Sequence, residues 1–372
     1  MAEDLASAPR NSYAAAGVDT AAGDLAVELM KSAVSATHGP EVLGGVGGFA
    51  GMFDASALLG YRRPLLASST DGVGTKVAIA QAIDKHDTVG QDLVGMVVDD
   101  IVVVGAKPLF MTDYIACGKV VPERIADIVR GVAEACSATG TALVGGETAE
   151  HPGLLGPDDY DMAGAATGVV EADRILGADR VRDGDAVIAL GSSGLHSNGY
   201  SLVRHIITNA GIAYGHQAAD LGTTWGEALL EPTWLYTLPL LAVIDRLGDA
   251  VHSLSHVTGG GIAANLARVL PAGSWTEVDR STWSPAPVFR VLSDLAGSSL
   301  ESAEGTWNLG IGFFAVVDGA QVAEAIAAIE AAGIPAWQVG TVRTSTRPDG
   351  EFEQGAKGVD GGAVRLIGAY AN

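Results

Sequence analysis

The chain has little cysteine, few aromatic residues and half as many basic as acidic residues. Its 372 residues include 2 cysteines, and Phe, Trp and Tyr together make up 6%. Cys117 and Cys136 form no ligand pattern in so long a chain, which indicates a reducing compartment. The 22 Lys and Arg residues against 44 Asp and Glu give a net charge of −22. This charge argues against nucleic acid or an anionic membrane as partner, so an anionic substrate must meet local cations, backbone amides or a metal ion.

Long hydrophobic runs are also absent from the sequence. No apolar run reaches the roughly 18 residues of a membrane helix, and the acidic N-terminus has no basic segment followed by an apolar one. We therefore expect a soluble, cytoplasmic protein. Glycine, by contrast, is abundant at 50 residues, and 48% of the residues are hydrophobic. This length and composition indicate two domains built from closely packed α/β layers.

The first half of the chain alternates predicted strands and helices. Residues 1–12 are rich in Ala, Ser and Pro and are predicted to be flexible. Asp19 can cap a helix whose buried face carries Leu25, Leu29 and Ala33. Further strands are expected at 64–70, 109–115, 141–144 and 162–170, and helices at 75–83, 87–104 and 122–139.

A charged, glycine-containing stretch at 171–185 marks the predicted domain boundary. The sequence thus predicts domains at 13–175 and 176–342 in an α/β (α+β) fold, followed by a glycine-rich tail at 343–372. In the second half we expect strands at 186–190, 251–257, 310–317, 337–342 and 363–367, helices at 198–210, 232–248 and 321–332, another helix opening after Gly261, and a polar excursion at 211–230.

The segment Asp71-Gly72-Val73-Gly74-Thr75-Lys76 follows the apolar run 64–70 and has the features of a nucleotide-binding loop. Its glycines allow backbone N–H groups to approach an anion. Asp71 can bind a hard cation through oxygen, and Lys76 adds positive charge at a helix start. These features suit a Mg-nucleotide, although the spacing is not that of a Walker A loop. A plain connecting turn of the same composition is the alternative.

A second glycine-rich segment, Gly44-Gly45-Val46-Gly47-Gly48, precedes this loop. It matches G-x-G-x-x-A, but no strand precedes it, so a dinucleotide-binding fold is rejected. We interpret it as a lid that closes over a bound phosphate, with a flexible connector as the alternative. Gly145-Gly146-Glu147-Thr148 ends a short apolar strand, where Glu147 could bind a ribose hydroxyl or a metal ion, or lie in a turn.

Two acidic neighbours, Asp99 and Asp100, interrupt an apolar helical segment. A carboxylate buried without a partner is costly, so at least one should meet a cation, a donor or water. An exposed acidic seam is the alternative. Neighbours on a helix project about 100° apart, so the two carboxylates are expected to have unequal roles.

Two histidine-containing loops lie where predicted strands lead into helices. His196-Ser197-Asn198-Gly199 and His256-Val257-Thr258-Gly259-Gly260 each place a histidine beside a helix start, which favours anions. Two such sites in one domain suit a phosphorylated substrate, whereas a structural histidine is the alternative in each case. No G-x-S-x-G segment surrounds the nearby serines, so a hydrolase triad has no support.

In combination these motifs resemble the phosphoribosylformylglycinamidine cyclo-ligases, also called aminoimidazole ribonucleotide synthetases. The resemblance extends over residues 12–342, and the order of the motifs is more specific than any one of them. The matching segments are Ser12-Tyr13, Ala16-Gly17-Val18-Asp19, Pro40-Glu41-Val42, Gly44–Phe49, Asp71–Lys76, His86-Asp87-Thr88-Val89-Gly90, Gly145–Glu150, Gly191–Ser201 and His256–Gly261.

The resemblance implies an ATP- and Mg²⁺-dependent enzyme that closes the imidazole ring of formylglycinamidine ribonucleotide. It implies a homodimer in which N-terminal strands of two subunits complete a shared β-barrel, and a C-terminal mixed sheet with packed helices. It assigns catalytic roles to His196, Lys31, Asn198 and His256, nucleotide binding to Gly45, Gly47, Gly48, Asp71, Gly72, Gly74, Thr75, Lys76 and Glu147, substrate binding to Ser197, Thr258, Gly259 and Gly260, and Mg²⁺ binding to Asp71 and Asp100.

Three departures from the family pattern stand out. Asp99 occupies a position where many members have Asn, Gly305-Thr306-Trp307-Asn308 replaces the usual Arg-Thr-Phe-Asn, and the tail is longer. Rival interpretations are a selenophosphate synthetase-like or thiamine monophosphate kinase-like enzyme, or a non-catalytic nucleotide-binding scaffold. The chain lacks the N-terminal Cys that selenophosphate synthesis uses, and a scaffold has no need of Asp71, Lys76, His196 and His256.

Overall fold

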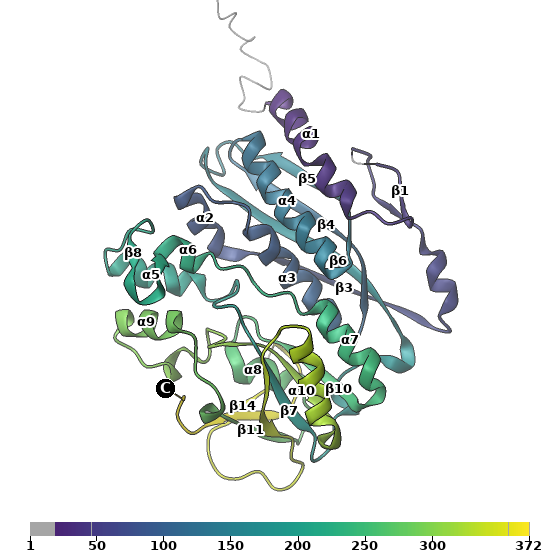
Figure 1. Cartoon of the computed structure of the whole chain (residues 1–372), viewed down its shortest axis with the longest axis vertical. Helices are drawn as coiled ribbons and strands as arrows, with labels where there is room; N and C mark the ends of the chain where they lie inside the picture. The colour runs from purple at the N-terminus through teal and green to yellow at the C-terminus, as the bar shows by residue number, and fades with distance from the viewer. Residues whose placement is uncertain (1–18, 46, 356, 372) are drawn as a thin grey trace, which may run out of the picture.

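Two β-sheets, one in each half of the chain, organise the fold (Figure 1). The computed structural model describes residues 19–45, 47–355 and 357–371. The predicted flexible segment 1–12 and the motif residues 12–18 lie outside the described residues. Among the helices within these ranges, none is both long and apolar enough to cross a membrane.

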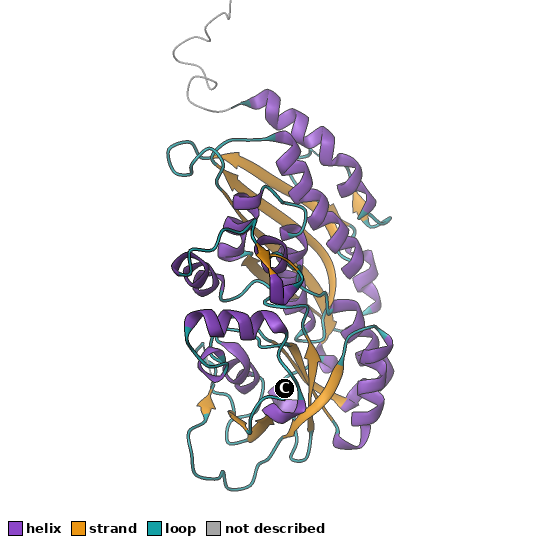
Figure 2. Ribbon diagram, turned by 60° about the vertical axis from the view of Figure 1, so that its left-hand side comes forward, coloured by secondary structure: helices purple, strands orange, loops and turns teal. Residues whose placement is uncertain are grey.

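The N-terminal half contains a four-stranded sheet in the order β3-β6-β4-β5. Strands β4 and β5 are parallel, whereas β6 runs antiparallel to β3 and β4. Helices pack on one face of this sheet, as Figure 2 shows for the upper half of the molecule. The elements are α1 (Thr20–Ala36), β3 (Pro64–Gly72), α3 (Val89–Val102), β4 (Lys107–Cys117), α4 (Pro122–Thr139), β5 (Ala142–Glu150) and β6 (Tyr160–Glu171).

Helix α1 begins where the sequence predicts, but its buried face differs from the prediction. The Asp19 carboxylate accepts hydrogen bonds from the N–H groups of Ala21 and Ala22, as an N-cap residue does. The predicted core residues Leu25 and Leu29 are 47% and 48% exposed, and Ala26 is buried instead. Helix α1 packs mainly against α4, and small side chains on the contact face let the two helices approach closely.

The C-terminal half contains a four-stranded antiparallel sheet in the order β10-β12-β7-β13. It is covered on both faces. Ile188 and Leu190 pack in a cluster with α7 and α10, while Val187 and Ala189 belong to the main core on the other face. The elements are β7 (Ala186–Gly191), α5 (Tyr200–Asn209), α7 (Thr237–Leu247), β10 (Val251–His256), α8 (Gly261–Arg268), α9 (Pro287–Ala296), β12 (Ile311–Val317), α10 (Val322–Ala331) and β13 (Ala336–Thr341).

Several elements differ from the sequence-based expectation. Gly145–Thr148 does not end a strand, because β5 continues through it to Glu150. The excursion 211–230 contains a hairpin and a short helix. In the tail, the strand expected at 363–367 forms beside β11, and an additional short strand, β14, pairs with it. The remaining elements are β1 (Val42–Leu43), β2 (Met52–Phe53), α2 (Val77–Ile83), β8 (Gln217–Ala218), β9 (Thr223–Thr224), α6 (Trp225–Leu229), β11 (Trp275–Asp279), β14 (Glu353–Gln354) and β15 (Ala363–Ile367).

The fold is therefore mixed α/β, with the two sheets in separate halves. The single chain holds the N-terminal sheet as an open sheet rather than a barrel in the described residues. Its face away from the helices is exposed, as the alternating burial of β3 and β6 shows.

Candidate active site

Asp71, Asp100 and His256 come together where the two halves of the molecule meet. Asp71 lies near the end of β3, Asp100 near the end of α3, and His256 at the last position of β10. The His256 side chain is 3% exposed, and its Nδ1 lies 2.9 Å from a carboxylate oxygen of Asp100. This pair joins a helix of the first half to a strand of the second.

The pKa shifts of these groups follow from their mutual positions. Burial raises the pKa of Asp71, and the nearby Asp100 carboxylate raises it further, outweighing the Gly72 N–H, His256 and the tail residue Lys357. Burial lowers the pKa of His256, but the carboxylates of Asp100, Asp99 and Asp71 outweigh burial and raise its pKa overall. The cluster thus favours a charged imidazolium between carboxylates.

His196 lies nearby and has the opposite electrostatic tendency. Its side chain is 1% exposed, and burial, His256 and Lys76 all lower its pKa well below the ordinary value. Its Nε2 lies 3.3 Å from the N–H of Ser193, while Nδ1 has no partner among the described residues. The Nε2 of His256 likewise has no partner there. The two imidazoles therefore have pKa values shifted in opposite directions, and each keeps one ring nitrogen without a described partner, a pattern typical of acid–base pairs.

An aromatic row links the two histidines. The rings of His256 and Phe313 stack with centroids 4.9 Å apart, Phe313 lies 5.2 Å from Tyr236, and Tyr236 lies 6.0 Å from His196. The Tyr236 hydroxyl donates to the Gly191 carbonyl at 2.6 Å. A Cβ at Gly312 would lie 2.0 Å from that hydroxyl and 2.7 Å from the His196 ring, so only glycine fits there.

Asp99 and Asp100 have different surroundings. Asp99 is fully buried and accepts hydrogen bonds from the N–H of Tyr236 and, at 2.6 Å, from the hydroxyl of Thr237. Burial raises the pKa of Asp99 to about 6. Asp99 thus satisfies donors at the start of α7, whereas the side chain of Asp100 is 41% exposed and faces His256.

The structure corrects the assignment of Lys76 to phosphate contact. Its side chain is fully buried, and its ammonium bonds the Asp92 carboxylate at 2.8 Å and the carbonyls of His196 and Glu231 at 3.0 and 2.7 Å. An ammonium has three donors, and all three are used. Lys76 therefore holds the His196 loop against α3 instead of presenting charge to a ligand.

The predicted substrate residues lie on two loops beside this cluster. Ser197 is buried, and its hydroxyl has no partner among the described residues. The Asn198 amide lies 3.5 Å from the sulfur of Met96, and its oxygen would touch a Cβ placed on Gly259. Thr258, Gly259 and Gly260 precede α8, and Gly260 has a φ of +104° that favours glycine.

The remaining loop residues of the Asp71 motif lie on the rim of the site. The Gly72 N–H donates to the Asp71 carboxylate at 2.7 Å. Gly74 adopts a φ of +69°, and the Thr75 hydroxyl lies 3.2 Å from that of Ser201 on α5. The motif therefore contacts the His196 segment from across the boundary between the halves.

Four other predicted nucleotide-binding residues line a separate cavity of about 340 Å³ beside α1 and β5, which we call the α1–β5 pocket. They are Gly45, Gly47, Gly48 and Glu147. Lys31 is not among its lining residues. The Lys31 side chain is 57% exposed and lies 3.9 Å from Glu28 on the same helix, so within one chain it does not join His196, Asn198 and His256 as predicted.

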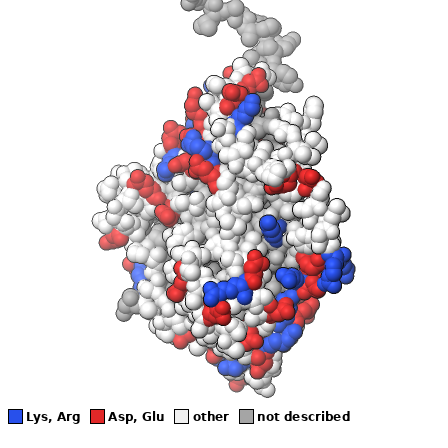
Figure 3. Space-filling model, turned by 45° about the vertical axis from the view of Figure 1, so that its right-hand side comes forward, with Lys and Arg blue, Asp and Glu red and all other residues white. Residues whose placement is uncertain are grey.

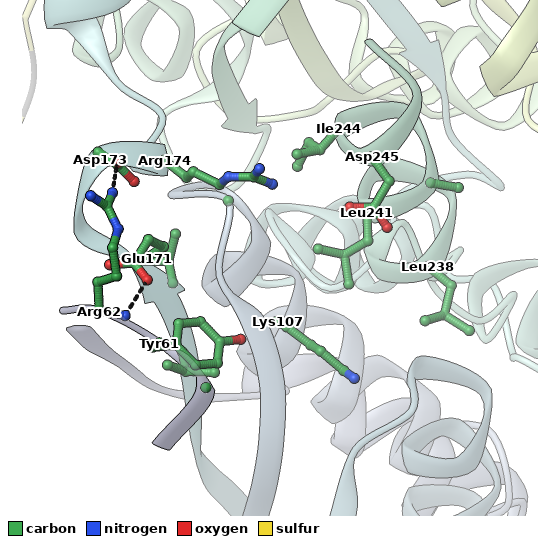
Figure 4. A pocket seen from close by; sticks show the side chains of 15 residues that line it. Tyr61, Arg62, Lys107, Glu171, Asp173, Arg174, Leu238, Leu241, Ile244 and Asp245 are labelled. Carbon is green, nitrogen blue, oxygen red and sulfur yellow. Dashed lines mark hydrogen bonds and ion pairs between the residues drawn. The ribbon is translucent and has the colours of Figure 1, made fainter. Parts of the chain in front are cut away.

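Two larger cavities lie elsewhere. One, of about 1030 Å³, includes Gly259 and Gly260 together with tail residues such as Arg347 and Lys357. The other, of about 910 Å³, lies between α7 and the N-terminal sheet and contains none of the predicted site residues. Figure 4 shows Lys107 and Arg174 extending toward α7 in this groove, while Arg62 pairs with Asp173. Acidic and basic side chains are mixed across the face shown in Figure 3.

The donor set at Asp71 and Asp100 fits a magnesium ion that arrives with a nucleotide. Mg²⁺ uses one or two carboxylates together with waters and phosphate oxygens. The described residues hold no cluster of three or more His, Cys, Asp or Glu side chains placed to bind a metal ion. The Asp100 carboxylate raises the pKa of Asp71, and a bound cation would relieve this repulsion.

Some functional residues have no distinctive signal in the sequence. Asp92 accepts hydrogen bonds from Lys76 and from both the N–H and the hydroxyl of Thr233. In the sequence alone it looks like an ordinary polar residue of a helix. Asn308 bonds the Gly194 carbonyl at 2.8 Å and so positions the His196 loop. The Asn of the divergent Gly305–Asn308 segment therefore has a clear structural role.

Comparison with known proteins identifies both halves of the chain. The family described as AIR synthase related protein matches with its N-terminal domain over residues 54–170 and its C-terminal domain over residues 182–352. The phosphoribosylformylglycinamidine cyclo-ligase of a Geobacillus species is 47% identical over 332 residues, covering 89% of this chain and 95% of the relative. That of Sorangium cellulosum is 48% identical over 333 residues, covering 89% and 94%.

More distant structures share the fold. Escherichia coli HypE, a hydrogenase maturation protein, aligns with a TM-score of 0.62 at 18% identity over 95% of each chain. Thiamine-monophosphate kinase from Stenotrophomonas maltophilia aligns with a TM-score of 0.61 at 18% identity, covering 92% of this chain and 97% of the other. These likenesses establish the architecture, whereas the identity to the cyclo-ligases establishes membership. The chain belongs to the phosphoribosylformylglycinamidine cyclo-ligase family.

Proposed function

We propose that this protein is an ATP-dependent cyclo-ligase that converts formylglycinamidine ribonucleotide to 5-aminoimidazole ribonucleotide, ADP and phosphate in cytoplasmic purine biosynthesis. The observation that carries the proposal is the family membership, at 47% identity over 89% of the chain. The Asp71, Asp100 and His256 cluster adds groups suited to a metal-bound triphosphate, and the two histidines add an acid–base pair.

In the proposed reaction the formyl oxygen attacks the γ-phosphorus of ATP and ADP leaves. The amidine-side nitrogen then attacks the activated carbon, phosphate leaves with the oxygen, and a proton is lost from nitrogen. Mg²⁺ would neutralise the charge of the triphosphate when bound, held by Asp71 and Asp100. The carboxylates around His256 raise its pKa and so favour the cationic ring, which suits a developing phosphate, while neutral His196, whose Nε2 accepts from the Ser193 N–H, carries its proton on Nδ1 and can donate it there.

The two halves take different parts in this proposal. We assign ATP binding and dimerisation to residues 13–175, substrate binding to 176–342, and leave the tail 343–372 as a separate segment. The open face of the N-terminal sheet supports a homodimer in which a second copy completes a barrel, since a bare sheet face favours association. The glycines at 45, 47 and 48, with Glu147, are assigned to the nucleotide through the α1–β5 pocket.

The test measures phosphate release from ATP with and without formylglycinamidine ribonucleotide, and the ribonucleotide product by mass spectrometry. We expect release to depend on the ribonucleotide and to match the aminoimidazole ribonucleotide formed, one for one. A stable phosphorylated product without ring closure would indicate a kinase instead. ATP binding without turnover would indicate a non-catalytic scaffold, and either result would overturn the proposal.

A further inference from the structure

The tail forms part of a large cavity in the C-terminal half. This cavity of about 1030 Å³, which we call the tail cavity, is lined by Gly259 and Gly260 of the loop before α8 and by tail residues that include Arg347 and Lys357. Every residue that lines it belongs to the C-terminal half or to the tail. Because we assign substrate binding to the C-terminal half, the cavity is placed to receive a group of the ribonucleotide rather than of ATP.

The tail is held against α8. The Gly362 N–H donates to the carbonyls of Ala267 and Leu270 at 3.0 and 2.9 Å, and β14 and β15 both lie against this helix. A Cβ added to Gly361 would lie 2.2 Å from the Ala267 carbonyl oxygen, so glycine is required for this close approach. Because α8 begins directly after the Thr258–Gly260 loop, these contacts fix the tail relative to that loop.

The loop before α8 presents backbone donors. Among the described residues, the N–H groups of Gly259 and Gly260 have no hydrogen-bond acceptor, whereas the N–H of Ile262 donates to the Glu304 carbonyl at 3.1 Å. Consecutive backbone N–H groups without an acceptor in the protein can bind an anion. The two glycines that line the tail cavity therefore offer donors to an anionic group there.

Four cationic side chains among the described residues line the tail cavity, and three of them have partners in the protein. Arg280 and Arg365 each form an ion pair with a glutamate. The guanidinium groups of Arg347 and Arg365 lie 5.2 and 4.6 Å from the centre of the Phe352 ring. Lys357 is exposed, and its ammonium forms neither an ion pair nor a hydrogen bond with the described residues. Lys357 is therefore the cation that remains available to a ligand.

The charge of Lys357 also acts on the neighbouring Asp71 cluster. It favours the ionised form of Asp71 and so acts to lower the pKa of that carboxyl, although burial and Asp100 prevail. Lys357 thus lies near both the loop before α8 and the proposed Mg²⁺ site. Other carboxylates that line the tail cavity are exposed to water, which weakens their effect on a bound anion; they are those of Glu301, Glu351 and Glu353.

We propose that Lys357 is a substrate-binding residue that contacts the phosphate group of formylglycinamidine ribonucleotide in the tail cavity, together with the backbone N–H groups of Gly259 and Gly260. This inference rests on the proposed function, which supplies the ribonucleotide as substrate. It deepens that function by giving the tail a role, since the tail brings a cation to an anionic group in a protein with a net charge of −22. A lysine ammonium forms charge-assisted hydrogen bonds with phosphate oxygens.

The experiment compares formylglycinamidine ribonucleotide with its nucleoside, which lacks the phosphate group, in the full-length protein. Calorimetry without ATP measures the affinity for each, and steady-state assays measure KM for the ribonucleotide and for ATP. We expect Lys357→Asn to weaken ribonucleotide binding by about tenfold, as for the loss of one charge-assisted hydrogen bond, and to leave nucleoside binding unchanged. KM for the ribonucleotide should rise by the same factor, while KM for ATP stays within about twofold.

The choice of asparagine preserves the backbone. Lys357 has a φ of +55°, a conformation that asparagine adopts more readily than most residues, so the exposed substitution should leave the fold intact. Lys357→Arg keeps the charge and should bind the ribonucleotide within about threefold of the wild type. Arg343→Gln is the matched control, because it removes the same charge from an exposed tail residue that does not line the cavity, and it should bind as the wild type does.

A second substitution tests whether charge is the cause. Gly305 lines the tail cavity, and a Cβ added there meets nothing within 4 Å. Gly305→Arg combined with Lys357→Asn should therefore recover part of the lost affinity for the ribonucleotide. A double variant that binds no more tightly than Lys357→Asn alone would contradict the inference.

The outcomes separate this inference from the proposed function. If the wild type closes the ring but Lys357→Asn binds the ribonucleotide as tightly as the wild type, or raises KM for ATP alone, the inference is wrong and the function stands. Equal affinity of the wild type for ribonucleotide and nucleoside, or an equal loss in Arg343→Gln, would likewise overturn it. If the wild type does not close the ring, the function fails, and calorimetry still shows whether Lys357 contributes to binding of the phosphate group.

Discussion

The two four-stranded sheets of this protein differ in how they are covered. In β6 of the N-terminal sheet, Asp161, Ala163 and Ala165 are exposed and alternate with buried residues. In β12 of the C-terminal sheet all seven residues from Ile311 to Val317 are buried. The first sheet has helices on one face, and the second is enclosed on both. A sheet with one covered face has strands in which apolar and polar residues alternate. A sheet covered on both faces has strands that are continuous apolar runs.

The exposed face of the N-terminal sheet is mostly small or weakly polar, with Leu66 at 65% and Tyr114 at 42% exposed. Exposing such a face to water carries only a small free-energy penalty, and the face is still flat enough to pack against a partner. The C-terminal sheet, by contrast, carries His256 at a strand end and stacks it on Phe313. The comparison teaches that one sheet leaves a face open, where we propose that a second copy packs, and that the other sheet is enclosed and holds His256 rigidly.

The sharpest test of this difference compares Phe313→Ala with Leu66→Ala. Phe313 is fully buried, so its truncation should lower the free energy of unfolding by about 3–5 kcal/mol and loosen His256. Leu66→Ala should cost less than about 0.5 kcal/mol in the monomer. Denaturant unfolding at low protein concentration measures both. Comparable losses would show that the N-terminal face is covered even in a single chain.

A second test concerns α3, which packs on the N-terminal sheet and also contacts β10 and α7. Asp100→Asn should reduce ring closure by about a hundredfold or more, because it removes the charge beside His256 that the proposed Mg²⁺ site would use. Asp99→Asn should stay within a few-fold of wild type, since its amide oxygen can accept from Tyr236 and Thr237. Steady-state assays at equal ATP and Mg²⁺ measure both. Equal losses would mean that the two acids share one role.

Thr167→Arg is expected to have the smallest effect on the stability of the folded chain. It should still weaken the proposed dimer. Thr167 lies opposite Ser68 in the ladder between β6 and β3 and is partly exposed on the open face. The substitution should leave the melting temperature of the separated chain nearly unchanged and raise the dimer dissociation constant. Sedimentation velocity over a concentration series measures this. A dimer as stable as the wild type would place the interface elsewhere.

The sequence by itself determined most elements and the family. Pro122–Thr139 forms the predicted helix with its Pro at the start, Asp19 caps α1, and the continuous run at 311–317 is a buried strand. These features depend on local chemistry, namely capping, fixed φ and hydrophobic period. The ordered motifs from Asp71 to Gly261 were specific enough to name a family that the comparisons confirm.

Only the tertiary structure decided which polar groups are available to a ligand. Lys76 and Asp100 both belong to segments predicted to bind a nucleotide. All three ammonium donors of Lys76 form hydrogen bonds inside the protein, whereas the Asp100 side chain remains partly exposed beside His256. The sequence of β4 does not show that the Asp113 carboxylate lies in the space left free by Gly146 of β5. Only the pairing of the two strands reveals this contact. The physical reason is that hydrogen-bond partners and burial depend on residues that are distant in the chain. His256 and Asp100, for example, are 156 positions apart. The local hydrophobic pattern of a segment gives no information about such partners.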